Sequence, residues 1–151
     1  MKEIIPLLKK IFFDKINSQR LLYISSFLTF GVGDGVSAIY MMEKTDAMRE
    51  ANPMIRFLYA DSGKQGVIAF KLWYTLMILF LVWIVSKKTN TYWTINGFLM
   101  AFTIGGIIAV RANMMAAYGL IPPSPEYVIT TYLFMIFLFM MIGDLLDKLH
   151  T

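Results

Sequence analysis

Cysteine is absent from the 151-residue sequence, and histidine occurs once, at His150, next to the last residue. A chain without cysteine has no disulfide, no thiolate metal ligand and no dithiol redox chemistry. We expect the terminal His150 to be frayed, which argues against a histidine-ligated metal and against a Ser-His-Asp triad. The sequence therefore predicts no metal site and no cofactor.

Charged residues are also scarce, at 16% of the chain, whereas hydrophobic residues make up 58%. The apolar residues gather in four stretches of about 20 residues each. That is the length an α-helix needs to cross the roughly 30 Å hydrocarbon core of a bilayer. The sequence therefore predicts an integral membrane protein with a single transmembrane domain.

The four predicted spans are helices, because the bilayer core offers the backbone no water as a hydrogen-bond partner. The connection at 87–91 is short, so the second and third spans are expected to form an antiparallel hairpin. The segment GLIPPSPE, 119–126, predicts a turn because of its prolines. We expect an all-α bundle of four transmembrane helices in up-down-up-down order, with spans at about 21–42, 66–86, 92–117 and 127–146.

Residues 1–20 precede this 21–151 domain and combine apolar side chains with five basic ones. From Leu7 onward they predict a basic amphipathic helix that lies in the membrane interface. The apolar run that starts at Leu21 is too long for a signal-peptide core and lacks a clear cleavage site. We therefore expect it to be retained as the first span.

Basic residues are divided unequally between the two predicted membrane faces. Residues 1–20, 87–91 and the C-terminal end together hold eight Lys and Arg, and the opposite face holds fewer. The positive-inside rule then places both termini in the cytoplasm of a multi-pass cell-membrane protein. We interpret the net charge of +4 as topology and lipid contact, not as nucleic-acid binding.

The strongest polar residues converge on the non-cytoplasmic end of the predicted bundle. Asp34 lies in the outer half of the first span, Lys71 near the outer start of the second, and Arg111 near the outer end of the third. A charge inside the hydrocarbon costs about 2.5–3.5 kcal/mol and should face protein or water. We predict the ion pairs Asp34–Arg111 and Glu50–Lys71, with a snorkelling Arg111 at the interface as the alternative.

The connector between the first two spans contains REANPMIRF, residues 49–57. Asn52 before Pro53 is typical of a helix start, with Asn52 as the N-cap and Pro53 in the first helical position. The apolar residues that follow predict a short helix, either in the interface or folded into the mouth of the bundle. The segment DSGKQG, 61–66, is expected to turn the chain into the second span.

Small residues at four-residue spacing indicate where two helices can approach closely. The first span offers Gly31 and Gly35, and the third offers Ala101, Gly105 and Ala109. If the first and third spans meet on these faces, Asp34 and Arg111 come within reach of each other.

The fourth span is almost wholly apolar, which predicts a surface facing lipid or another subunit. At its cytoplasmic end we expect Asp144 and Asp147 to be solvated, with Lys148 as the partner of one of them. The alternative is a pair of catalytic carboxylates, for which the sequence shows no partner set.

The residues GDGVSAIYMMEKTDAMREANPMIRFLY, followed by FKLW, carry a family resemblance. They resemble the Asp-x-x-Ser/Thr … Glu-x-Asn-Pro … Lys pattern of a small polytopic membrane family of archaea and bacteria, the domain-of-unknown-function family numbered 5658. The resemblance covers roughly residues 21–115, and the hydroxyl of Ser37 stands where threonine is often expected. It implies a membrane fold but no reaction. The motif maps onto Asp34, Ser37, Glu50, Asn52, Pro53 and Lys71.

The leading functional prediction is a polar site at the non-cytoplasmic mouth, acting in binding, transport or assembly of a membrane complex. The predicted site residues are Asp34, Ser37, Glu50, Asn52, Lys71, Arg111 and Asn113. The expected partners are the lipid bilayer and a second copy or another membrane subunit. An enzyme is less favoured than a binding protein.

Two alternatives remain. In a membrane-embedded enzyme acting on a lipid or lipid-linked substrate, Asp34 or Glu50 would be the base or a metal ligand, and Arg111 and Lys71 would bind phosphate. In a purely structural network the charges would only fix helix register. A transporter requires a cavity and interrupted helices, an enzyme requires converging carboxylates, and a structural network requires direct ion pairs without a cavity.

Overall fold

The computed structural model describes residues 15–149, and all secondary-structure elements assigned in that range are helices. The elements are α2 (Lys15–Ser26), the π-helix η1 (Phe27–Gly33), α3 (Asp34–Lys44), the 3-10 helix η2 (Ala47–Arg49), α4 (Pro53–Lys88), α5 (Tyr92–Ala117) and α6 (Pro125–Leu149). The predicted interfacial helix lies mostly outside the described residues, and its last part, from Lys15, belongs to α2. The prediction for His150 lies outside them as well.

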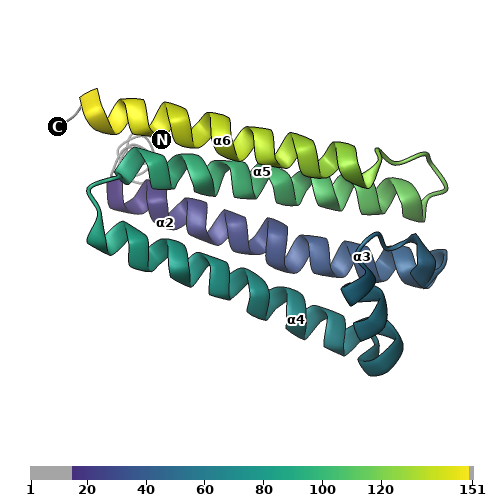
Figure 1. Cartoon of the computed structure of the whole chain (residues 1–151). Coiled ribbons are helices and arrows are strands. Elements are labelled where there is room, and N and C mark those ends of the chain that lie inside the picture. The colour runs from purple at the N-terminus through teal and green to yellow at the C-terminus, as the bar shows by residue number, and fades with distance from the viewer. Residues whose placement is uncertain (1–14, 150–151) are drawn as a thin grey trace, which may run out of the picture.

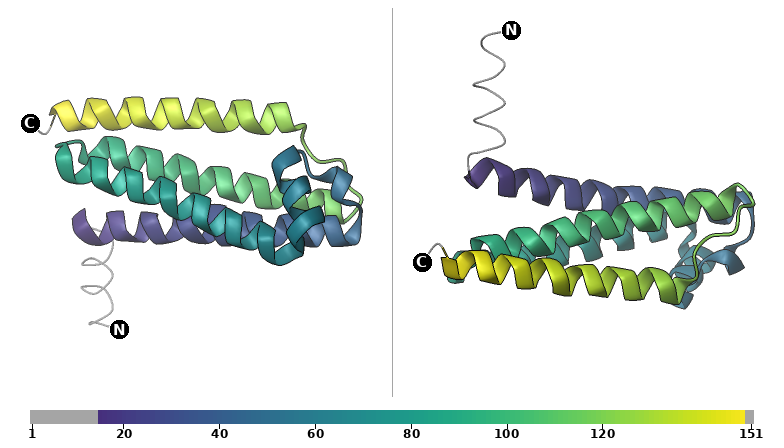
Figure 2. Two further views of the ribbon diagram at one scale, coloured as in Figure 1. Left: turned by 60° about the horizontal axis from the view of Figure 1, so that its bottom comes forward. Right: turned by 90° about the horizontal axis from the view of Figure 1, so that it is seen from above.

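Four long helices are apolar enough to cross a membrane: Ser18–Lys44, Pro53–Lys88, Tyr92–Ala117 and Pro125–Leu149. They lie side by side and alternate in direction (Figure 1, Figure 2). The start of α2, the α4–α5 connection and the end of α6 lie at one end, here called the terminal pole. The α3–α4 connector and the α5–α6 turn lie at the other end, the connector pole. This arrangement indicates a multi-pass membrane protein.

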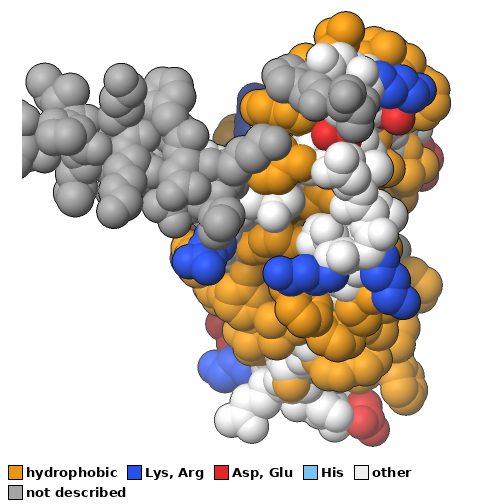
Figure 3. Space-filling model, turned by 90° about the vertical axis from the view of Figure 1, so that its left-hand side faces the viewer, with side chains coloured by type: hydrophobic (Ala, Val, Ile, Leu, Met, Phe, Trp, Pro, Cys, Tyr) orange, Lys and Arg blue, Asp and Glu red, His pale blue; other side chains and the backbone are white. Residues whose placement is uncertain are grey.

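Basic side chains gather at the terminal pole. Figure 3 looks onto this end and shows Lys and Arg side chains around apolar helix ends. Arg20 of α2, Lys87 and Lys88 of α4, and Lys148 of α6 belong to these ends. A membrane surface with anionic lipids would attract such a pole.

The helix bounds follow the hydropathy pattern closely at α5, which covers the same residues, 92–117, as the predicted third span. The fourth helix runs from Pro125 to Leu149 rather than from 127 to 146. Proline suits the first turn of a helix because that turn leaves its N–H groups unpaired in any case. The end of the turn therefore contributes residues to the helix that hydropathy alone assigns to the loop.

The connector contains the predicted short helix, which is joined to the second span within α4. The Asn52 side chain caps it as predicted, because its Oδ1 accepts a hydrogen bond from the Met54 main-chain N–H at 2.9 Å. At Gly63 the backbone takes φ 63° and ψ −163°, a conformation open to glycine, and the helix direction breaks. The segment before Gly63 folds over the connector pole (Figure 1), where Ile55 is only 2% exposed.

A π-helix interrupts the first span directly before Asp34. Seven consecutive residues, Phe27–Gly33, adopt this wider turn, which is rare and frequently found at functional sites. No sequence pattern predicted it. Because a π turn contains more residues than an α turn, it rotates the side chains that follow and so helps to set the direction of Asp34.

The first and third spans pack together, but they do not meet on the two stripes of small residues considered in the sequence. Gly106, rather than Gly105, makes the closest approach, because an added Cβ there would lie 2.6 Å from the main-chain nitrogen of Phe30. Gly105 faces α6, and Gly31 and Gly35 face side chains of α4. Four-residue spacing marks a stripe of small residues, but it does not say which neighbouring helix the stripe faces.

Helix α5 is the centre of the packing, with α6 along one side and α2, η1 and α3 along the other. The α5–α6 contact is close at Gly97 and Gly143, where an added Cβ would lie 2.3 Å from the Phe139 carbonyl oxygen and 2.4 Å from that of Trp93. Most other large side chains of α6 are exposed apolar groups. A surface of this kind suits contact with lipid.

Asp147 is not solvated, so that part of the sequence prediction is wrong. Its carboxylate accepts hydrogen bonds from the main-chain N–H groups of Trp93 (2.8 Å) and Thr94 (2.9 Å) and from the Thr94 hydroxyl (2.8 Å). These N–H groups open α5, whose own N-cap residue, Thr91, makes no side-chain cap. Asp147 therefore caps α5 from a different helix. The predicted exposed pair is confirmed between Asp144 and Lys148 at 2.6 Å.

We expect Asp147→Ala to lower the free energy of unfolding by about 1–2 kcal/mol, the usual cost of losing an N-cap. The matched control is Asp144→Ala on the same helix, which removes only an exposed ion pair and should cost less than about 1 kcal/mol. Denaturant titration of the purified protein in detergent measures both. Equal losses for the two variants would contradict the cap.

Candidate functional site

An ion pair between two spans is the centre of the polar network at the connector pole. The Nζ atom of Lys71, on α4, lies 2.5 Å from Oδ2 of Asp34, the first residue of α3. The two side chains are 14% and 13% exposed. The lysine stem passes close to Gly35, where an added Cβ would lie 3.7 Å from Cβ of Lys71, an ordinary van der Waals contact. The pair joins the first span to the second.

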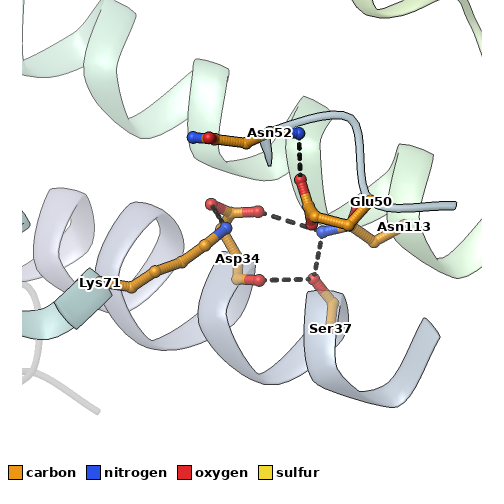
Figure 4. A network of polar contacts seen from close by, with 6 residues as sticks. All are labelled: Asp34, Ser37, Glu50, Asn52, Lys71 and Asn113. Atoms are coloured by element: carbon orange, nitrogen blue, oxygen red, sulfur yellow. Dashed lines mark hydrogen bonds and ion pairs between the residues drawn. The ribbon is translucent and has the colours of Figure 1, made fainter. Parts of the chain in front are cut away.

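Asn113 adds the third span to the network. Its Nδ2 atom donates to Oδ1 of Asp34 and to Oγ of Ser37, each at 3.0 Å. The Ser37 hydroxyl in turn donates to the main-chain oxygen of Asp34 at 3.3 Å. Both carboxylate oxygens of Asp34 therefore have donors, and three helices converge on one side chain (Figure 4).

The connector contributes Glu50 and Asn52, which lie above the helix ends. Glu50 is buried, and its Oε1 atom accepts a hydrogen bond from the main-chain N–H of Asn52 at 2.9 Å (Figure 4). This bond closes a tight turn directly before α4 begins at Pro53. The turn holds the Asn52 side chain at the start of α4, where its Oδ1 atom caps the helix.

Both ion pairs predicted from the sequence are wrong. Asp34 pairs with Lys71 instead of Arg111, and Glu50 makes no ion pair among residues 15–149. Arg111 is exposed, as in the snorkelling alternative. Arg111 and Asn113 are two positions apart, roughly 200° around a helix, so they cannot both face the first span. Asn113 is the residue that does.

A cavity of about 330 Å³ lies beside the ion pair. Asp34 and Lys71 form part of its wall, and Asn52 of the connector reaches the same space. The rest of the wall is mainly apolar and includes the rings of three residues, Phe30, Phe70 and Tyr74. A mostly apolar cavity with a few placed polar groups is the usual form of a small-molecule site.

Helical spacing could have found part of this wall. Phe30 precedes Asp34 by four positions and Thr75 follows Lys71 by four, so each pair occupies one face of its helix. Thr75 is 1% exposed and lies between α4 and Gly31 of the first span. Tyr74 follows Lys71 by three positions and so lies on the same face of α4, whereas Phe70, next to Lys71 in the sequence, carries no such signal.

The fold and the network define a multi-pass helical membrane protein with a buried ion pair next to a cavity. Residues 25–119 match the model of a family described as Domain of unknown function (DUF5658), and the chain belongs to this family. The matched range contains all seven predicted site residues, and the family resemblance noted in the sequence is thereby confirmed. No curated protein and no solved structure matched the chain.

We expect Asp34→Asn and Lys71→Met each to lower the free energy of unfolding by about 3–5 kcal/mol, because each change leaves the other group buried without its charge partner. The double variant should lose less than the sum of the two single losses. Denaturant titration in detergent measures the cycle.

The matched control for this cycle is the exposed pair Glu43–Lys64, whose side chains are 45% and 66% exposed. Its coupling should stay below about 1 kcal/mol. Arg111→Gln should leave the free energy of unfolding nearly unchanged. Additive losses for Asp34 and Lys71 would exclude a coupled pair.

Proposed function

We propose that this protein is a membrane-embedded binding protein whose site is the cavity beside the Asp34–Lys71 pair. The observation that carries the proposal is the position of the pair. Both side chains form part of the cavity wall instead of being sealed between helices. Binding at this site is the step that transport or assembly of a membrane complex would use.

The cavity wall favours a small amphiphile that carries an oxygen acceptor. A lysine ammonium has three N–H donors, and among the described residues Asp34 is the one hydrogen-bond partner that the structure shows for Lys71 Nζ. A carboxylate, phosphate or carbonyl oxygen in the cavity can accept from the remaining donors. The rings of Phe30, Phe70 and Tyr74 suit an apolar body.

The environment of the carboxylates favours binding over a base-catalysed reaction. Asp34 accepts from Lys71 and Asn113, and Glu50 accepts from the Asn52 main chain, so each carboxylate has a donor from within the protein. A general base needs a free acceptor oxygen within hydrogen-bond reach of the proton that it removes, and both carboxylate oxygens of Asp34 already accept hydrogen bonds. A purely structural pair remains the competing explanation, and the ligand experiment separates the two.

We expect at least one of three soluble probes, glycerol phosphate, phosphocholine or a short-chain fatty acid, to raise the melting temperature of the purified protein in detergent. A ligand at about 100 times its Kd stabilises a protein by roughly 2.7 kcal/mol. Met54→Trp should abolish this shift, because Met54 lines the cavity and is 52% exposed, so the larger ring can fill the space.

The control variant is Phe57→Trp, on the same short helix. Phe57 is 67% exposed and does not line the cavity, so the ligand shift should persist. If no probe shifts the melting temperature of the unmodified protein while Asp34→Asn remains destabilised, the network is structural and the binding proposal fails.

We also infer that the connector pole faces the non-cytoplasmic side, which places the cavity there. The support is the sequence, in which residues 1–20, 87–91 and the C-terminal end hold eight Lys and Arg and the stretches predicted at the opposite face hold fewer. Because the chain contains no cysteine, single labels can be introduced by Gln65→Cys at the connector pole and Asn90→Cys at the terminal pole. A membrane-impermeant maleimide added to intact cells should label only the first variant, and labelling of only the second would reverse the topology.

A further inference from the structure

A second cavity, of about 580 Å³, lies at the terminal pole, far along the helices from the Asp34 network. Its wall comes from the start of α2, the first turns of α5 and the last turns of α6. Helices α2 and α6 pack on different sides of α5, so the cavity is a groove over α5 between them. Met100 and Ile142 line it and are each 44% exposed, so the groove opens sideways on the apolar face of the molecule.

Among the described residues, the side-chain oxygen Oδ1 of Asn96 is a buried polar atom in this groove without a hydrogen-bond partner. Asn96 lies on α5, is 5% exposed and lines the groove. A buried amide carbonyl without a donor costs about 1–3 kcal/mol. A membrane ligand with a hydroxyl group can supply that donor.

The depth of Asn96 fits the boundary between lipid head groups and acyl chains. Asn96 lies four residues after Tyr92, where α5 begins, which is about 6 Å along the helix axis. Beyond it, from Gly97 to Met100 and across to Phe139, the lining is apolar. A lipid placed here would have its polar region near Asn96 and an acyl chain along the groove.

The charge at this pole selects among lipids. The surrounding helix ends carry Arg20, Lys87, Lys88 and Lys148, which outnumber the two carboxylates of the described residues at this pole, Asp144 and Asp147. Figure 3 shows Lys and Arg side chains at this end of the molecule. Each basic residue near a membrane surface attracts anionic lipid with about 1 kcal/mol. An anionic head group therefore fits this end better than a zwitterionic one.

We propose that the groove between α2 and α6 is a binding site for one anionic, hydroxyl-bearing phospholipid. Its acyl chain lies over α5, and a lipid hydroxyl donates a hydrogen bond to Oδ1 of Asn96. The proposal is independent of the cavity beside Asp34, because the two cavities share no lining residue.

The test uses native mass spectrometry of the full chain in detergent with three lipids of the same acyl chains. Phosphatidylglycerol has hydroxyl donors and a net negative charge. Diacylglycerol has a hydroxyl group and no charge, and phosphatidylcholine has no hydroxyl group and no net charge. We expect diacylglycerol to bind about fivefold more tightly than phosphatidylcholine because of the hydrogen bond. Phosphatidylglycerol should bind about another fivefold more tightly because of its charge.

Two variants assign these preferences to the groove. Asn96→Leu should abolish the preference for diacylglycerol over phosphatidylcholine, while the melting temperature without added lipid stays the same or rises, because an unpartnered carbonyl is removed. Met100→Trp should weaken binding of all three lipids by filling the groove. Its control is Ile107→Trp, which is also exposed on α5 but lies outside the groove and should bind as the unmodified protein does.

Three results would overturn the proposal. The first is equal affinity of the unmodified protein for the three lipids. The second is a preference for diacylglycerol over phosphatidylcholine that survives Asn96→Leu. The third is a loss of stability in Asn96→Leu without lipid, which would mean that the amide is satisfied within the protein. None of these results bears on ligand binding beside Asp34, which Met54→Trp tests separately.

Discussion

The ion pair between Asp34 and Lys71 is the constraint on which the arrangement of the first two spans depends. A charge on one span has no acceptable place in the hydrocarbon unless the other span presents its partner at the same depth. This requirement fixes the register of α4 against α3, since slipping either helix by one turn would separate the charges. Asn113 extends the same constraint to α5, because its amide donates to Asp34 and Ser37. One carboxylate thus sets the relative positions of three helices, and the cavity lies against that fixed wall.

Much of this could be predicted from the sequence, because hydropathy and helix-capping are local properties. The extent of α5, the cap at Asn52, the break near Gly63 and the membership of Asp34 and Lys71 in a polar cluster all follow from short stretches of residues. The choice of partners could not be predicted, because it depends on how each helix is rotated about its axis. The π-helix before Asp34 alters that rotation and leaves no recognisable pattern in Phe27–Gly33. The role of Asp147 was missed for a similar reason, since its hydrogen-bond donors lie more than fifty positions earlier in the chain.

The two poles of the molecule differ in chemistry although the same helices build both. At the connector pole, charged and amide groups satisfy one another around Asp34, and a turn from Glu50 to Asn52 covers the helix ends. At the terminal pole the groove is mainly apolar, the Oδ1 atom of Asn96 has no hydrogen-bond partner among the described residues, and Lys and Arg side chains lie on the surface. The first environment suits a ligand that brings its own acceptor, and the second suits one that brings a donor and a long apolar chain. The chain therefore presents two cavities of opposite hydrogen-bonding character, one near each end of the helices.

The cap that Asp147 provides has a consequence for how the chain is made. Protein synthesis proceeds from the N-terminus, and α5 leaves the ribosome before the end of α6. Until Asp147 has been synthesised, the first N–H groups of α5 lack the carboxylate that caps them in the folded protein. The close contact between Gly143 and Trp93 cannot form before then either. The third span therefore reaches its final form only after the fourth has been inserted. Helices α5 and α6 therefore form a single unit during biogenesis, a hairpin in which the end of α6 caps the start of α5.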